Sequence, residues 1–336
     1  MTHANLLIQL QTTPVLGVSL GNVRILRLDR QGGPAPGNKW YKLQGNLVEA
    51  QRLGVRRLVS FGGGWSNHLH ALAAVGREQG YETVGLVRGE AGEADTAMLA
   101  DARRWGMQLV RVSRSEYRRR NDPDYLQVIS ERFAPCLVIP EGGANAAGAR
   151  GCLAIAALLR KAAPQVERVV VGVGTGTTLA GVAAGLGSGH EVIGVSALKG
   201  ALDLEQRVRQ LLVDYDAAAV ARWSVLHDFH CGGFARVSDE LRAFMLAFER
   251  IHGVPLDPIY TAKATLAIHT KLQSGEWEAS EPIVMIHTGG LQGRRGFSFC
   301  EPSLADIVPL FMGSEPPQDY WWRPYNLAKS APDGCW

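Results

Sequence analysis

The segment Gly37–Leu43 reads Gly-Asn-Lys-Trp-Tyr-Lys-Leu and brings two lysines, Lys39 and Lys42, to the predicted start of a helix. A charged lysine is unfavourable there because the amino-terminal end of a helix carries a partial positive charge. This effect favours the neutral amine, the nucleophilic form that condenses with an aldehyde to give a Schiff base. Taken alone, the segment is also compatible with two surface lysines on a first helical turn.

A second segment, Val171–Gly181, is rich in glycine and threonine and joins a predicted buried strand to a predicted helix. Free backbone amides, the helix dipole and threonine hydroxyls together make such a turn a binding site for phosphate. It is not a Walker motif, because no Gly-Lys-Ser/Thr follows. A dinucleotide site would need an acidic residue at the end of the next strand, whereas Glu191–Val195 begins with its acid. We therefore expect a single phosphate as the ligand.

Ser66 and Asn67 follow a strand end and three glycines, in the sequence Phe-Gly-Gly-Gly-Trp-Ser-Asn-His. Either residue could serve as a helix N-cap. The same hydroxyl, amide and backbone N–H groups would also suit a substrate carboxylate and a cofactor hydroxyl. His68 and His70 are two residues apart and do not share a helix face, so we expect no metal site here.

Two further segments carry polar groups that could face a ligand. His287–Gly290 reads His-Thr-Gly-Gly at the end of the last predicted strand, where the Thr288 hydroxyl could meet a ring nitrogen. Turn formation alone would also explain these glycines. Tyr260, in a proline turn that caps a helix, is either a core aromatic with a hydrated hydroxyl or a residue of the site.

The elements that must position these groups alternate between short β-branched runs and alanine- and leucine-rich stretches. The predicted strands are Val23–Leu28, Arg57–Phe61, Thr83–Val87, Gln108–Val112, Leu137–Ile139, Arg168–Gly172, Glu191–Val195 and Ile283–Ile286. The predicted helices include Leu43–Leu53, His68–Gln79, Thr96–Trp105, Arg150–Ala163, Thr178–Leu186 and Asp239–His252. Strands separated by helices predict the α/β class, with parallel sheets covered on both faces. Glycines mark several strand ends, where ligands bind in such sheets.

Charge and length exclude several classes of function. The chain has 336 residues and a net charge of +3, from 35 Lys and Arg against 32 Asp and Glu. One dense basic run, Arg114–Arg120, is more typical of a solvated surface than of a nucleic-acid site, so we expect no nucleic-acid partner. No apolar run reaches 18 residues and no secretory signal is apparent, which predicts a soluble cytoplasmic protein without a membrane partner.

The cysteines and the end of the chain are less informative. Five cysteines, Cys136, Cys152, Cys231, Cys300 and Cys335, are scattered without a C-x-x-C pair. This pattern favours reduced thiols over a disulfide framework or a zinc site. From about Ser303 the chain becomes rich in proline and tryptophan, which is compatible with either a packed extension or an oligomer contact.

Six motifs, in this order along the chain, resemble those of the D-cysteine desulfhydrase and aminocyclopropane-carboxylate deaminase family. They are Gly-Asn-Lys, Ser-Asn-His, Pro-Glu-Gly-Gly at Pro140–Gly143, the Gly-Thr-Gly-Thr-Thr loop, Asp-Pro-x-Tyr and His-Thr-Gly-Gly. The resemblance extends from about Thr13 to Phe297. It implies the tryptophan-synthase-β-like fold of pyridoxal-phosphate enzymes, with two open, twisted, mostly parallel sheets and helices on both faces.

The resemblance also implies a domain organisation and an assembly. Residues 1–43 and 146–336 would form a larger cofactor-binding domain, and residues 44–145 a smaller domain that carries the Ser-Asn-His loop. Residues 303–336 would be a C-terminal extension. Homodimers are common for this fold, so a homodimer is expected by analogy.

The site implied by the resemblance can be placed residue by residue. Lys39, rather than Lys42, would bind pyridoxal 5'-phosphate as a Schiff base and move the α-proton. Asn67 would hydrogen-bond the phenolic oxygen of the cofactor, and Thr288 would lie near its pyridine nitrogen. The phosphate would be bound by Gly174, Thr175, Gly176, Thr177 and Thr178. The substrate pocket would contain Trp65, Ser66, Asn67, His68, Phe234 and Tyr260, with Ser66 at the substrate carboxylate or in proton transfer and Tyr260 as acid/base or leaving-group partner.

These residue types favour β-elimination. A hydroxyl rather than a carboxylate beside the pyridine nitrogen weakens the ring as an electron sink, which favours prompt loss of a β-substituent. The expected reaction is desulfhydrase-type cleavage of a small amino acid such as D-cysteine to pyruvate, ammonia and sulfide. An aminocyclopropane-carboxylate-type deaminase or an amino-acid racemase is the enzymatic alternative. A phosphate-binding regulator on the same fold is the non-enzymatic one.

Some residues depart from the family pattern. Family deaminases have a glutamate after the tyrosine and an apolar residue before the last glycine pair, where this chain has Thr261 and Thr288. Phe234 stands where many members have a further tyrosine, and Trp65 where a glutamine commonly precedes the serine. The last two changes predict a more apolar pocket and a bulkier substrate than D-cysteine.

Overall fold

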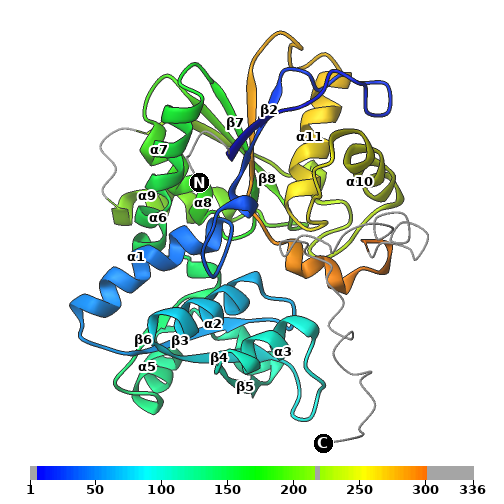
Figure 1. The fold of residues 1–336 in the computed structure, drawn as a ribbon. Helices are drawn as coiled ribbons and strands as arrows, with labels where there is room; N and C mark the ends of the chain where they lie inside the picture. The colour runs from blue at the N-terminus through cyan, green and yellow to red at the C-terminus, as the bar shows by residue number, and fades with distance from the viewer. Residues whose placement is uncertain (1–5, 216–219, 301–336) are drawn as a thin grey trace, which may run out of the picture.

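The computed structural model describes residues 6–215 and 220–300, which form two lobes joined by the long first helix (Figure 1). The strands are β1 (Leu7–Gln9), β2 (Val23–Arg27), β3 (Arg57–Gly62), β4 (Glu82–Arg88), β5 (Gln108–Val112), β6 (Leu137–Ile139), β7 (Arg168–Val173), β8 (Glu191–Ser196), β9 (Arg222–Leu226) and β10 (Ile283–His287). The helices are α1 (Asn38–Arg52), α2 (Asn67–Gln79), α3 (Ala97–Arg104), α4 (Arg114–Arg118), α5 (Pro123–Arg132), α6 (Ala146–Gly151), α7 (Leu153–Ala162), α8 (Thr177–Leu186), α9 (Leu204–Tyr215), α10 (Asp239–His252) and α11 (Thr261–Gln273).

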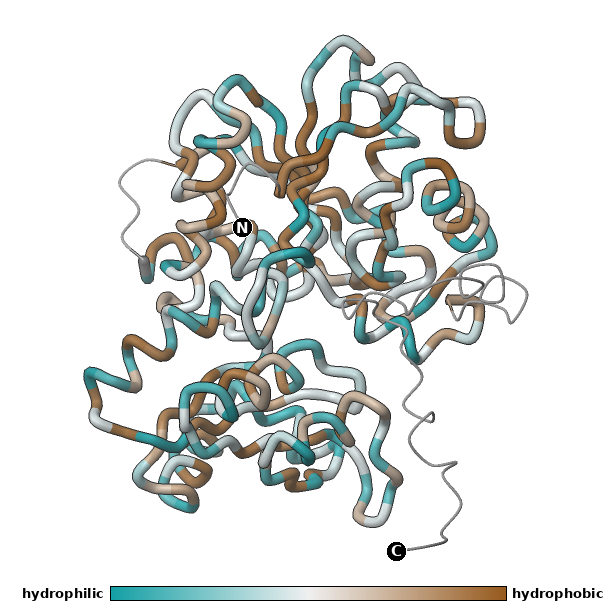
Figure 2. The backbone as a smooth tube through the Cα atoms, in the orientation of Figure 1, coloured by the Kyte–Doolittle hydropathy of each residue, from teal (hydrophilic) through white to brown (hydrophobic). Residues whose placement is uncertain are grey.

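The larger sheet has six strands in the order β1-β2-β10-β7-β8-β9, and only β1 runs antiparallel to its neighbour. Alternate residues of β7 face opposite sides, as the pleat requires. Val169 and Val171 pack with side chains of α7, α8 and α9, whereas Val170 packs with side chains of α10 and α11. Burial on both faces explains why these strands are almost continuously apolar (Figure 2).

The smaller sheet is fully parallel and has the order β5-β4-β3-β6. Leu58 of β3 packs with apolar residues of α1, α2 and α3 on one face of the sheet. Val59 and Phe61 pack with Tyr117 of α4 and Tyr125 of α5 on the other. Both sheets therefore have helices on both faces, and the predicted α/β class with two mostly parallel sheets is confirmed.

The predicted elements need three corrections. All eight predicted strands are present, but the edge strands β1 and β9 were not anticipated. Helix α1 begins at Asn38 rather than Leu43. The single helix predicted over Arg150–Ala163 is two helices, α6 and α7, which meet at Cys152. Helix α6 packs so closely on α1 that a side chain at Gly151 would collide with the Tyr41 carbonyl oxygen.

Residues 57–139 form the smaller lobe's sheet, and the chain enters this lobe through α1 (Figure 1). The domain boundaries at residues 43/44 and 145/146 stay a prediction, although residues 57–139 supply every strand of the smaller sheet. The expected extension, residues 303–336, lies outside the described residues, as does Cys335. Within residues 6–215 and 220–300, none of the helices has the length and apolar character needed to span a bilayer.

The carboxyl ends of the parallel strands open on the space between the lobes. In the larger lobe, β2 and β7 lead to the starts of α1 and α8, and β10 leads to the turn at Thr288. In the smaller lobe, β3 leads to the Gly63 loop, β4 ends at Arg88, and β6 leads to the turn at Glu141. This arrangement gathers polar loops from distant parts of the chain at one cleft.

Candidate active site

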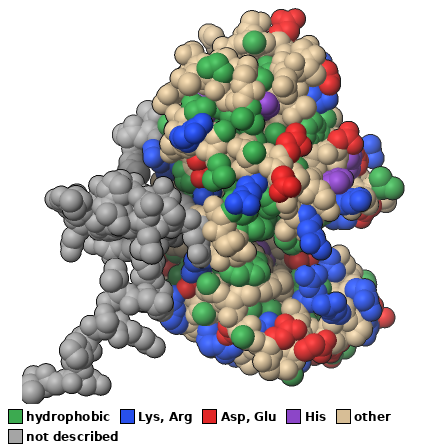
Figure 3. Space-filling view, turned by 90° about the vertical axis from the view of Figure 1, so that its right-hand side faces the viewer, with side chains coloured by type: hydrophobic (Ala, Val, Ile, Leu, Met, Phe, Trp, Pro, Cys, Tyr) green, Lys and Arg blue, Asp and Glu red, His purple; other side chains and the backbone are tan. Residues whose placement is uncertain are grey.

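The cleft between the lobes has a volume of about 2270 Å³. It is visible as a hollow between the upper and lower parts of the molecule in Figure 3. Most of the predicted site residues line it: Lys39, Trp65, Ser66, Asn67, His68, Gly174, Thr175, Gly176, Thr178, Phe234, Tyr260 and Thr288. Thr177 is the exception, because its side chain is fully buried and shares a 3.0 Å hydrogen bond with the Thr175 hydroxyl.

Lys39 is the second residue of α1, and its position depends on the glycine before it. Gly37 has φ of 109° and pairs with Gly289, and the Asn38 backbone N–H donates to the Thr288 carbonyl oxygen at 3.1 Å. A side chain at Gly37 would collide with that oxygen. The turn after β10 therefore fixes the start of α1, and with it the side chain of Lys39.

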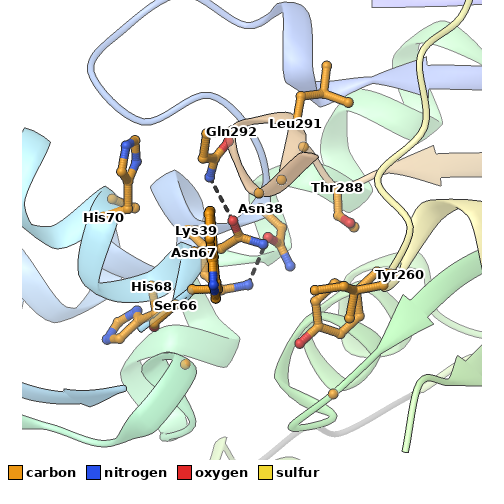
Figure 4. A pocket seen from close by; sticks show the side chains of 18 of the residues that line it. Asn38, Lys39, Ser66, Asn67, His68, His70, Tyr260, Thr288, Leu291 and Gln292 are labelled. Carbon is orange, nitrogen blue, oxygen red and sulfur yellow. Dashed lines mark hydrogen bonds between the residues drawn. The ribbon is translucent and has the colours of Figure 1, made fainter. Parts of the chain in front are cut away.

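Asn38, which the sequence did not single out, links the lysine to the glycine-threonine loop. Its Oδ1 accepts a 3.1 Å hydrogen bond from Lys39 Nζ (Figure 4). Its Nδ2 donates to Thr178 Oγ1 at 2.8 Å. Burial lowers the pKa of the Lys39 amine to about 8. A much larger fraction of this amine is therefore neutral near pH 7.5 than in an ordinary lysine.

A second amine, that of Lys42, lies one turn further along α1 and is almost fully buried. Its Nζ donates to the Gly142 carbonyl oxygen at 3.2 Å. Burial, followed by the charge of Lys39, lowers the pKa of Lys42 to about 7. Two amines therefore share this part of the cleft, and burial lowers the pKa of both toward neutral pH.

His68 lies beside these lysines and is a neutral imidazole. The Ser60 hydroxyl donates to the Ile139 carbonyl oxygen at 2.7 Å, so its oxygen, 2.9 Å from His68, accepts a hydrogen bond from Nε2–H. Nδ1 then carries a lone pair, for which no donor is present among the described residues. Burial, then the charges of Lys39 and Lys42, lowers the pKa of His68 to about 3.

The buried amine of Lys42 predicts a pH-dependent stability of the cofactor-free protein. The unfolded chain binds more protons than the folded one between about pH 7 and the ordinary lysine pKa of about 10.4, so the free energy of unfolding rises with pH in that range. Urea unfolding should show wild type more stable at pH 9 than at pH 7. Lys42→Met should be more stable than wild type at pH 7 and should depend less on pH. Lys161→Met, at an exposed position, is the control, and an unchanged slope in Lys42→Met would contradict this assignment.

Ser66 is the N-cap of α2, as one of the two alternatives from the sequence had it. Its Oγ accepts a 3.2 Å hydrogen bond from the Leu69 backbone N–H, which leaves its own proton available for another acceptor. Asn67 is the first residue of the helix, and its Oδ1 accepts a 2.8 Å hydrogen bond from Gln292 Nε2. This hydrogen bond orients the Asn67 amide and leaves its Nδ2 free to donate. Nδ2 lies beside Gly290, because a Cβ added to Gly290 would stand 3.0 Å from it.

The turn from Gly174 to Thr178 has the features of an anion site. Gly176 is the N-cap of α8 with φ of 87°, and no side chain caps the first turn. The first backbone N–H groups of a helix lack intrahelical acceptors, so they are available to an anion. A Cβ at Gly174 would lie 3.1 Å from the Tyr260 hydroxyl oxygen, which places that phenol against the loop.

Tyr260 is positioned by a carboxylate that the sequence did not single out. The side chain of Asp257 accepts hydrogen bonds from the backbone N–H groups of Ile259, Tyr260 and Thr261, at 2.9 to 3.0 Å, and so caps the start of α11. Burial, then the charges of Asp257 and Glu141, raises the pKa of Tyr260. Its phenol is therefore a proton donor near neutral pH.

The two aromatic residues predicted in the pocket are at its periphery. Phe234 is 51% exposed, and its ring makes an edge contact with Tyr260 at 6.4 Å between centroids. Its loop is held by Lys263, a fully buried lysine that donates to the Gly233 carbonyl oxygen at 2.8 Å. Trp65 is 38% exposed and packs on the backbone of Gly296.

Comparison with known proteins agrees with this geometry. A family model described as pyridoxal-phosphate dependent enzyme matches residues 13–289. A solved structure described as an aminocyclopropane-carboxylate deaminase homologue is 24% identical, with a TM-score of 0.71 over 81% of this chain and 85% of that one. Threonine deaminase isoform 2 from Solanum lycopersicum is 14% identical, with a TM-score of 0.58 over 86% and 81%. A hydrogen sulfide-producing enzyme from Fusobacterium nucleatum is 13% identical, with a TM-score of 0.59 over 86% and 97%.

Two mostly parallel sheets enclose a cleft that is lined by a lysine with a lowered pKa and by the uncapped start of α8, an arrangement suited to a phosphate-bearing aldehyde cofactor. The chain belongs to the pyridoxal-phosphate dependent enzyme family. Its residues fit that cofactor, because the uncapped first turn of α8 suits a phosphate and the Lys39 amine suits an aldehyde.

Proposed function

We propose that this protein is a carbon–sulfur lyase that catalyses β-elimination on a small amino acid, giving pyruvate, ammonia and the released β-substituent. D-Cysteine is the simplest candidate substrate, as in the desulfhydrase group that the motifs resemble. One observation carries the proposal: the Lys39 amine and the Tyr260 phenol line the same cleft, and burial lowers the pKa of the first to about 8 and raises the pKa of the second. β-Elimination needs such a base for the α-proton and such an acid for the leaving group.

In this proposal the cofactor is held from both lobes. Lys39 would bind its aldehyde carbon, and the backbone amides from Gly174 to Thr178, with the hydroxyls of Thr175 and Thr178, would bind its phosphate. Asn67 Nδ2 would donate to the phenolic oxygen, with its orientation fixed by Gln292. The Thr288 side chain, at the end of β10, would face the ring nitrogen. Bound pyridoxal phosphate supplies an electron sink for the charge left at Cα when its proton departs.

Side chains of the protein would bind the substrate and transfer the protons. The Ser66 hydroxyl and the free N–H groups at the start of α2 would bind the substrate carboxylate, which fixes Cα beside Lys39. Lys39 Nζ would take the α-proton, and Tyr260 Oη would donate a proton to the departing β-substituent. Asn38 would orient the amine during this transfer through its contacts with Lys39 and Thr178.

Ring-opening deamination is less well supported by the residues. Family deaminases have a glutamate after the tyrosine, and here the position is Thr261. Its side chain is fully buried, and its hydroxyl bonds the backbone of Asp257 instead of facing the cleft. The position therefore offers no acid or base to a substrate.

The test is an assay for keto-acid release. The holoenzyme would be incubated with D- and L-cysteine, O-acetyl-serine, β-chloroalanine and aminocyclopropane-carboxylate, and pyruvate, 2-oxobutyrate, sulfide and amino-acid configuration would be measured. Pyruvate from a β-substituted amino acid is the expected result. Release of 2-oxobutyrate alone would assign a deaminase, and inversion of configuration without a keto acid would assign a racemase. No turnover of any β-substituted amino acid would overturn the lyase proposal.

A further inference from the structure

The wall of the cleft on the smaller lobe is strongly cationic. Lys and Arg outnumber Asp and Glu among the residues that line the cleft, and four of the arginines come from β4 and the stretch around α4: Arg88, Arg114, Arg118 and Arg120. Figure 3 shows Lys and Arg side chains gathered on this lobe beside the hollow. The basic run Arg114–Arg120, which the sequence suggested to be a solvated surface, therefore belongs partly to the cleft.

The helix geometry explains which arginines of the run face the cleft. Arg114 and Arg118 are four residues apart and share one face of α4. Arg119 does not line the cleft and instead pairs with Asp122 at 3.1 Å. The run is thus divided between Arg114, Arg118 and Arg120, which line the cleft, and Arg119, which does not.

Two residues behind this wall, Tyr117 and Glu141, contact its arginines. The Tyr117 ring packs under the guanidinium groups of Arg88 and Arg120, at 5.6 and 4.9 Å from its centroid. The Tyr117 hydroxyl and Arg120 Nε each donate to one oxygen of Glu141, both at 2.6 Å. Glu141 is therefore occupied by Tyr117 and Arg120, and Arg120 is neutralised.

Three cations of the wall have no such partner. No carboxylate within residues 6–215 and 220–300 pairs with Arg88, Arg114 or Arg118, in contrast to Arg119. Arg88 also reaches the loop of the proposed carboxylate site, because its terminal nitrogen lies 3.7 Å from where a Cβ of Gly63 would stand. The site proposed above already assigns the cofactor phosphate to α8 and the substrate carboxylate to Ser66. Neither of these two sites uses the guanidinium groups of Arg88, Arg114 and Arg118.

We propose that Arg88, Arg114 and Arg118 bind a second anionic group, carried by the β-substituent of the substrate. The substrate class is then amino acids whose side chain ends in a carboxylate, phosphate or similar anion, rather than cysteine itself. Guanidinium groups suit such oxyanions because they donate several hydrogen bonds and stay charged. The size of the cleft accommodates the longer side chain. The substrate class rests on the proposed function, whereas the anion site itself does not.

The anion site is tested by titrating the holoenzyme with succinate in a calorimeter at low salt. Succinate should bind to wild type and to Arg119→Gln alike. Its affinity should fall about tenfold or more in Arg88→Gln and in the double variant Arg114→Gln/Arg118→Gln, as for loss of a charged hydrogen bond. Higher salt should weaken binding to wild type. Absence of binding to wild type, or equal affinity in all four proteins, would overturn the site.

The substrate class is tested with two serine esters that differ in one distal carboxylate. Wild type should prefer O-succinyl-serine to O-acetyl-serine in kcat/KM by about tenfold, and Arg119→Gln should keep this preference. The variants of Arg88 and of Arg114 with Arg118 should lose it. Equal use of both esters by wild type, or a preference for O-acetyl-serine, would overturn the assignment. If neither ester is cleaved, the substrate class fails, the lyase proposal is decided by the other β-substituted amino acids, and the succinate titration still decides the anion site.

Discussion

Lys39→Ala is expected to remove the visible absorbance of the loaded enzyme and to lower kcat/KM by at least ~10²–10⁴-fold. The reason is that Lys39 combines a lowered pKa, of about 8, with a side chain that reaches the cleft and is oriented by Asn38. The loss of absorbance is measured on protein mixed with excess cofactor, so it does not depend on knowing the substrate. A surface variant, Lys161→Ala, should keep both absorbance and activity.

Lys42 is the only other lysine that lines the cleft among the described residues, so it is the alternative anchor. Its amine is nearly fully buried and already donates a hydrogen bond to the Gly142 carbonyl oxygen, whereas Lys39 Nζ donates to a side chain, that of Asn38. Borohydride reduction of the loaded enzyme followed by peptide mass mapping separates the two lysines. Cofactor attached to residue 39 is expected. Attachment to residue 42, with absorbance retained in Lys39→Ala, would transfer the anchoring role to Lys42.

Much of this arrangement could be predicted from local patterns. Apolar runs ending in glycine located the ends of β3, β7 and β10, and parallel pairing brings such ends to one edge of a sheet. Lys39, Ser66, Gly174 and Thr288 could therefore be placed at a common cleft. Each local pattern alone had an ordinary structural explanation, and for Ser66 the helix cap is indeed present.

The residues that the sequence did not reveal act through distant contacts. Gln292 and Asn67 are 225 residues apart, and nothing local to either predicts their hydrogen bond. Asn38 matters because its amide reaches Thr178, 140 residues away. The break between α6 and α7 lies beside the close backbone contact of α6 with α1, and helical periodicity over Arg150–Ala163 does not show it. A five-residue helix likewise gives too little periodicity to tell which arginines of Arg114–Arg120 face a cleft.

Gly176→Ala is expected to weaken cofactor binding by about 10- to 100-fold. Gly176 adopts φ of 87°, and a Cβ there would stand 2.7 Å from Val208 of α9. The alanine must either hold a strained backbone, at about 1–3 kcal/mol, or turn the first amides of α8 away from the phosphate. The first outcome lowers the stability of the cofactor-free protein, and the second lowers the affinity for the cofactor. Equilibrium dialysis of cofactor and urea unfolding of the cofactor-free protein measure the two effects separately.

Gly187→Ala is the matched control, since it lies at the other end of the same helix. Gly187 has a similar φ of 73°, but a Cβ there would meet nothing within 4 Å. Its alanine variant should therefore lose stability through backbone strain alone and keep the cofactor affinity of wild type. A selective loss of affinity in Gly176→Ala would support the first turn of α8 as the phosphate site. Equal affinities in the two variants would place the phosphate elsewhere, because only Gly176 belongs to the turn whose amides are uncapped.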